Sequence, residues 1–169
     1  SSDVCSSDLQ AVAIGVSAGT NSQGESAVAI GNGSGNFSQG TNAVAIGNGS
    51  GNNLQVQYAV AIGMNAGSQR QQMFAVAVGV GAGQYTQGES AVAIGNGSAT
   101  SNQGSGAAAI GYYAGNIKQG VNAVAMGSAA GQDRQGSGSI AIGYQSGFTG
   151  QAPNTVAMGV NAGYAGQGT

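Results

Sequence analysis

The side chains that could carry out acid–base chemistry are few and widely separated. Glu25 and Glu89 occupy the same place in a repeated unit, but four units separate them, which is about 19 Å if successive units stack like neighbouring strands. A catalytic carboxylate pair needs a separation of about 5 to 9.5 Å. Asp133 stands beside Arg134, in a segment that we expect to be a solvent-exposed loop. We therefore expect no catalytic residues and no enzyme activity.

Donors for metals and cofactors are equally scarce. The chain has no histidine and a single cysteine, Cys5, so a transition-metal site has almost no ligands to draw on. The glycine-rich segments GAGQ and GNGS lack the lysine and helix start of a phosphate-binding loop, and they lack the aspartates of a calcium-binding turn. The sequence thus predicts no metal site and no cofactor.

Glutamine forms the most regular polar pattern in the chain, recurring every sixteen residues without exception. If identical residues sit one above another, their side-chain amides can donate and accept in turn along a ladder. We therefore interpret this column as structural rather than ligand-binding. Its members are Gln23, Gln39, Gln55, Gln71, Gln87, Gln103, Gln119, Gln135, Gln151 and Gln167.

Composition excludes several classes of protein. Charged residues make up 5% of the chain and the net charge is −2, so the three basic residues cannot supply the positive field that nucleic-acid binding requires. No apolar run approaches the roughly eighteen residues of a membrane span, so we expect no direct membrane insertion by this segment. With 34 glycines and no tryptophan, a thick layered core is also excluded.

A repeat of sixteen residues determines the predicted architecture. The segment AVAIG begins at Ala11 and occurs, with small changes, in ten copies without insertion, the last being TVAMG at Thr155. Its second and fourth residues are aliphatic and its first and third are small, an alternation typical of a short strand. The fifth is always glycine, which suits a turn with positive φ. We predict an all-β parallel β-solenoid, or β-roll, of ten sixteen-residue coils with no helices of note.

The small residue at the third position of each strand predicts a flat, methyl-lined row. A lone stack of such coils buries little apolar surface, so we expect the row to be exposed and to pack against another copy of the chain. The candidate oligomer face consists of Ala13, Ala29, Ala45, Ala61, Ala77, Ala93, Ala109, Ala125, Ala141 and Ala157.

The first nine residues, SSDVCSSDL, share nothing with the repeat and resemble translated sequencing adapter. We therefore divide the chain into a non-repeat tail over 1–9, interpreted as an artefact, and a single solenoid array over 10–169.

The segments GTNAVAIGNGS, Gly40 to Ser50, and GVNAVAMGSAA, Gly120 to Ala130, resemble the YadA-like head repeats of trimeric autotransporter adhesins. The resemblance covers Ala11 to Thr169. It implies a left-handed parallel β-roll, a homotrimer, and an extracellular position on a cell surface, where the array grips a host-surface protein, a matrix protein or a glycan.

Two alternatives stay open. Similar arrays occur in fibre proteins of phages and large viruses, which would make this a tail-fibre segment on a virion surface. A monomeric ice-binding solenoid belongs to a different functional class, and it would keep its flat face free of partners. Oligomeric state discriminates between the fibre and the ice binder.

Overall fold

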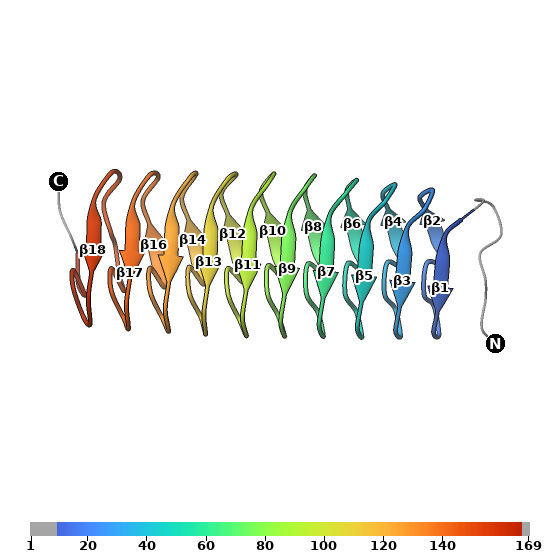
Figure 1. The fold of residues 1–169 in the computed structure, drawn as a ribbon, viewed down its shortest axis with the longest axis horizontal. Helices are drawn as coiled ribbons and strands as arrows, with labels where there is room; N and C mark the ends of the chain where they lie inside the picture. Colours follow the sequence, from blue (N-terminus) through green and yellow to red (C-terminus); the bar gives the residue numbers. More distant parts are fainter. Residues whose placement is uncertain (1–9, 167–169) are drawn as a thin grey trace.

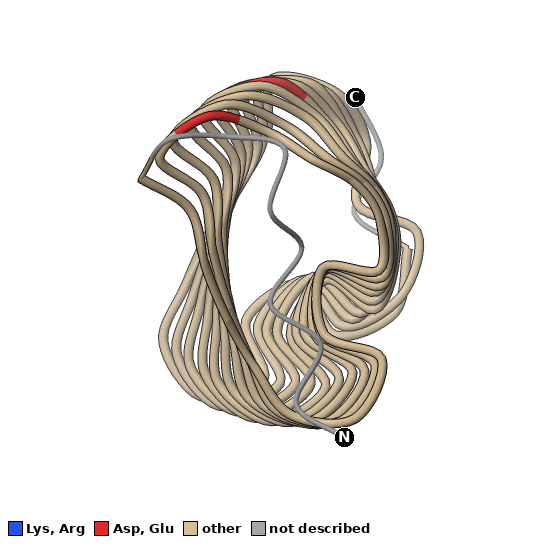
Figure 2. Cartoon of the chain, turned by 90° about the vertical axis from the view of Figure 1, so that its right-hand side faces the viewer, with Lys and Arg blue, Asp and Glu red and all other residues tan. Residues whose placement is uncertain are grey.

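The computed structural model describes residues 10–166, and these form a parallel β-solenoid that contains no helix. The predicted tail over 1–9, with Cys5, and Gln167 lie outside the described residues. The coils stack into a straight rod with β1 (Val12–Ile14) at one end and β18 (Val156–Met158) at the other (Figure 1). Viewed along the rod, successive coils follow nearly the same path (Figure 2). The predicted fold class is confirmed.

Sheet A is built from the AVAIG segments, each of which forms a three-residue strand paired in parallel with the next. Pairing joins Val12 to Val28 and Ala13 to Ala29, so the register advances by one whole repeat. Ten strands therefore enclose nine full turns of sixteen residues. The strands, in spatial order, are β1 (Val12–Ile14), β3 (Val28–Ile30), β5 (Val44–Ile46), β7 (Val60–Ile62), β9 (Val76–Val78), β11 (Val92–Ile94), β13 (Ala108–Ile110), β15 (Val124–Met126), β17 (Ile140–Ile142) and β18 (Val156–Met158).

Sheet B lies on the opposite side of the coil and is built from the segments that end in glutamine. Its eight strands, in chain order, are β2 (Asn21–Gln23), β4 (Phe37–Gln39), β6 (Asn53–Gln55), β8 (Gln69–Gln71), β10 (Tyr85–Gln87), β12 (Ser101–Gln103), β14 (Ile117–Gln119) and β16 (Asp133–Gln135). The expectation that Asp133 and Arg134 lie in a loop is wrong, because both belong to β16, in which Asp133 pairs with Ile117 of the neighbouring coil.

The middle residue of every sheet B strand has a left-handed backbone, for example Arg70 at φ 55° and Thr86 at φ 44°. This conformation turns the middle side chain outward together with the residue before it. Only the first and third residues of each strand therefore pair, as Tyr85 does with Ser101 and Gln87 with Gln103. As a result, the glutamine alone points into the coil.

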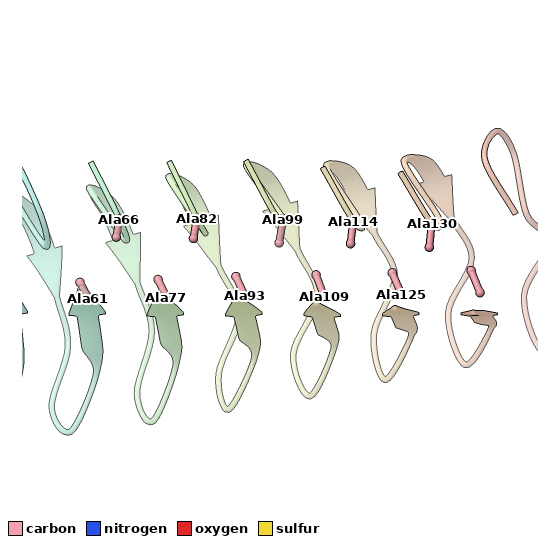
Figure 3. Close-up of a cluster of buried hydrophobic side chains, with 11 residues drawn as sticks. Ala61, Ala66, Ala77, Ala82, Ala93, Ala99, Ala109, Ala114, Ala125 and Ala130 are labelled. Carbon is pink, nitrogen blue, oxygen red and sulfur yellow. The ribbon is translucent and has the colours of Figure 1, made fainter. Parts of the chain in front are cut away.

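The interior is narrow and lined by small side chains. Ala61, Ala77 and Ala93 on sheet A face a second row on the opposite wall that includes Ala66 and Ala82 (Figure 3). Where this second row carries serine, the hydroxyl is buried and donates to the carbonyl three residues earlier, as Ser50 Oγ does to Gly47 O at 3.0 Å. A coil of sixteen residues therefore encloses little more than methyl groups and one amide.

Candidate functional site: the outer face of sheet A

The glutamine column lies inside the solenoid. Gln71 is fully buried, and its Nε2 donates to Val60 O at 2.7 Å, to Ala75 O at 3.1 Å and to Gln87 Oε1 at 3.2 Å. Its own Oε1 accepts from Gln55 Nε2 at 3.1 Å. The Gln71 amide thus joins sheet B to the backbone of sheet A and also bonds both of its neighbours along the rod. With every hydrogen-bonding atom engaged inside the coil, Gln71 has no group to offer a ligand.

The amide-to-amide bonds form runs rather than one continuous chain. One run passes from Gln39 through Gln55 and Gln71 to Gln87. Shorter runs join Gln103 to Gln119 and Gln135 to Gln151. At the start of each shorter run a buried Oε1, of Gln103 or of Gln135, has no hydrogen-bond partner.

The prediction that the alanine row is an exposed oligomer face is wrong. All ten alanines of that row, from Ala13 to Ala157, are buried in the interior, so none of them can contact a second copy. The physical reason is space. The opposite wall carries Ala, Ser and Gly at the facing positions, and a glycine there sits so close that a Cβ on Gly83 would lie 3.3 Å from Ala77 Cβ. An inward valine or isoleucine would not fit.

The aliphatic residues of the repeat are therefore displayed on the outside of sheet A. We name this surface the aliphatic face. Every member is at least partly exposed, Ile62 to 38% and Ile14 to 58%. The face consists of Val12, Ile14, Val28, Ile30, Val44, Ile46, Val60, Ile62, Val76, Val78, Val92, Ile94, Ala108, Ile110, Val124, Met126, Ile140, Ile142, Val156 and Met158.

No charged side chain belongs to the aliphatic face. Glu25 and Glu89 are exposed at the turn between sheet B and sheet A, and they remain four coils apart. Arg134 Nε lies 3.2 Å from Asp133 Oδ2 on the outside of sheet B. Within residues 10–166, no three His, Cys, Asp or Glu side chains gather into a group able to hold a metal ion. The same residues include no helix long and apolar enough to span a membrane.

A shallow groove of about 500 Å³ follows the turns after β2, β4 and β6. Its lining includes Ser22, Ser38, Thr41 and Gln57, and none of the lining residues is ionisable. Such a groove offers hydroxyl and amide groups for hydrogen bonding but no acid or base.

No protein-family model, no curated protein and no solved structure matches this chain. The chain is a parallel β-solenoid with no family assignment. The exposure of the aliphatic face is the feature of it that calls for a functional explanation.

Proposed function

We propose that this chain is a structural and adhesive segment of an extracellular fibre, in which three copies pack side by side through the aliphatic face. The single observation that carries the proposal is the exposure of two continuous aliphatic rows along the whole of sheet A. Isolated exposed apolar residues are ordinary, but a contiguous apolar patch of more than a few hundred Å² marks an interaction surface.

The outer surfaces of the two sheets differ in how regularly their residues repeat, and this difference supports the assignment. On sheet B the first residue of successive strands changes freely, from Asn21 to Phe37, Tyr85, Ile117 and Asp133. On sheet A the outward residues stay aliphatic in every strand. The exterior of sheet A thus varies as little as a packed interior does, which is what we expect of a surface that is buried inside an assembly.

The extent of the face matches what a stable interface needs. A partly exposed Val or Ile contributes roughly 40 Å² of apolar surface, so twenty such residues present on the order of 800 Å². Stable protein interfaces bury about 800 Å² on each partner. The absence of charge from the face removes the desolvation cost that a buried ion would add.

In this arrangement the outer surface of sheet B stays free. It displays large side chains such as Phe37, Leu54 and Tyr85 beside charged ones such as Lys118. This variable surface is where the fibre would contact a host protein, a matrix protein or a glycan, on a cell surface in the adhesin version of the proposal and on a virion in the fibre version. The resemblance to YadA-like head repeats supports a trimer and a left-handed coil.

Sedimentation equilibrium of the 169-residue chain tests the proposal. We expect a mass three times that of one chain, independent of loading concentration. Replacing two members of the aliphatic face by charge, Ile62→Glu with Ile94→Glu, should return the mass to that of a monomer, because two carboxylates per copy would be buried without partners.

A matched control carries the same two charges on sheet B, Leu54→Glu with Tyr85→Glu, at side chains of similar exposure. This variant should remain trimeric. Circular dichroism verifies that both variants keep their strands. A folded wild-type monomer would contradict the proposal outright, whatever the variants do, and a monomer that also reshapes ice crystals would favour the ice-binding alternative.

A further inference from the structure

The aliphatic face alone does not define how two copies align along the rod. Its rows repeat every coil, about 4.8 Å, with nearly the same side chains. Sliding one copy by a coil would lose contact only at the ends. Any alignment must therefore come from residues beside the face, and this inference rests on the self-association proposed above.

Two columns of residues border the face, one along the starts of the sheet A strands and one along their ends. The entry column holds the residue two positions before each strand, such as Tyr58 before β7. The exit column holds the residue two positions after each strand, such as Met64 after β7. Six residues of extended chain separate the two columns within one copy, about 20 Å, so the columns of a single chain cannot touch each other.

Entry and exit residues of the same coil nevertheless match in kind. The coils of β7 and β9 have an aromatic entry residue, Tyr58 or Phe74, and an aliphatic exit residue, Met64 or Val80. All four side chains are 43–50% exposed, and the Tyr58 and Phe74 rings stack with centroids 5.3 Å apart. Methionine and aromatic rings make favourable contacts.

The coils of β13 and β17 show the opposite size distribution. Their exit residues are Tyr112 and Tyr144, both more than half exposed, and their entry residues are Gly106 and Gly138. A large exit side chain is thus combined with an entry residue that has no side chain.

The remaining internal coils combine polar with polar. Asn42 enters and Asn48 leaves the coil of β5, and Ser90 enters and Asn96 leaves that of β11. The coils of β3 and β15 follow the same rule, with Ser26 and Asn32, and with Asn122 and Ser128. Only the coils of β1 and β18, at the ends of the described array, depart from it.

Backbone strain gives an independent reason to look outside the chain. Tyr58 and Phe74 have φ values of 61° and 60°, a left-handed conformation that is unfavourable for bulky residues. The other internal coils place Gly, Ser or Asn at the same point. The Tyr58 and Phe74 rings stack on each other but stay about half exposed, and backbone strain of this kind clusters at functional sites.

We infer that the entry column of one copy packs against the exit column of the next, coil against equal coil, so that the copies are parallel and in register around a closed ring. A ring of copies uses two different edges at each contact, which is the head-to-tail type of interface. When the copies are in register, each aromatic entry residue meets an aliphatic exit residue, and each exit tyrosine meets an entry glycine. Each remaining amide or hydroxyl side chain meets another amide or hydroxyl. A slip of one coil would place Asn42 against Met64 and break these matches.

Disulfide trapping in the full chain tests the register. On a Cys5→Ser background, the matched variant Asn42→Cys with Asn48→Cys brings both thiols to the same height on neighbouring copies. The mismatched control, Asn42→Cys with Asn96→Cys, offsets them by three coils, about 14 Å, beyond the reach of a disulfide. All three asparagines are exposed.

After mild oxidation we expect covalent trimers from the matched variant, at least tenfold faster than any cross-linking of the control. Equal rates would mean that the copies slide, and faster linking of the control would mean another register. Either result in a chain that sediments as a trimer would overturn the register while leaving the proposed assembly intact. A chain that sediments as a monomer would overturn both.

A second measurement does not rely on cysteine chemistry. Tyr58→Ser with Phe74→Ser removes the aromatic entry residues and should raise the dissociation constant of the trimer at least thirtyfold, as loss of buried aromatic anchors does. Unchanged affinity would contradict the role given to these rings.

Discussion

Each coil has two corners occupied by glycine, and they are held in different ways. The first corner follows the sheet A strand, where glycine occurs in all ten copies with φ between 111° and 132°. The second follows the sheet B strand, where most copies have glycine, as at Gly40 and Gly104, and three copies have Val56, Gln72 or Ala152 instead. Within residues 10–166, the glycines of this second corner have no positive φ. Both corners are crowded, since a Cβ on Gly79 or on Gly104 would lie 2.6 Å from backbone of the next coil.

Crowding alone therefore does not decide which glycine is required. At the second corner, small backbone shifts make room for larger residues, and the structure accommodates Val56 there. A side chain holds that corner instead, because Gln71 Nε2 bonds to Val60 O before the corner and to Ala75 O after it. At the first corner the backbone conformation itself excludes L side chains, and no movement of a neighbour relieves that.

The largest expected effect compares the two corners directly. Gly79→Ala should destabilise the chain by about 4 kcal/mol or more, because the clash with Gly95 O adds to the strain at φ 128°. Gly104→Ala, with a contact of the same length but no positive φ, should cost about 1 kcal/mol. Urea unfolding followed by circular dichroism measures both, and similar losses for the two variants would show that contact rather than φ controls the corners.

A second, smaller effect concerns the side chain that holds the other corner. Gln71→Leu keeps a similar volume but removes the amide that bonds to both walls and leaves Gln87 Oε1 without its donor, so we expect a loss of about 3 kcal/mol. Gln69→Leu, on the exposed side of the same strand, is the matched control and should change stability by less than about 0.5 kcal/mol. Equal stability of the two variants would remove the glutamine from the account of the second corner.

The smallest effect should be a gain. Glycine occupies the ninth position of every described coil except one, where Ala99 is held at φ 44°. Ala99→Gly relieves the left-handed strain and should stabilise the chain by about 1 kcal/mol, less the entropy that glycine loses on folding. A measured loss of stability would mean that the buried methyl of Ala99 contributes more packing energy than its backbone costs.

The repeat length, the strands and both corners were predictable because they are local. A period of sixteen, two-residue alternation and recurrent glycine define a stacked coil whatever lies around it. The direction of the strands was not predictable from alternation alone, since Val60 and Ala61 only have to lie on opposite sides. Hydrophobicity suggested that the valine faces inward, but the small residues at Ala66 and Gly67, across the coil, leave room only for a methyl group.

The relation between the entry column and the exit column was not predictable from the sequence, for a similar reason. Tyr112 and Tyr144 share one position of the repeat, but the matching Gly106 and Gly138 gain meaning only once the outer side chains of the strand between them are known to be exposed. The relation joins residues that never meet in one chain, so no local pattern reveals it.

The direction of the hydrogen bonds has a mechanical consequence. Backbone bonds such as Val60 N to Ala75 O and Gly63 N to Ile46 O join one coil to the next and so run along the rod. Tension applied at the two ends would load every coil-to-coil interface alike, and the terminal coil, which is bonded to a neighbour on one side only, would open first. Each coil released would exchange about 5 Å of rod for roughly 50 Å of free chain. A single rod of this kind would lengthen stepwise under pulling force, absorbing work one coil at a time.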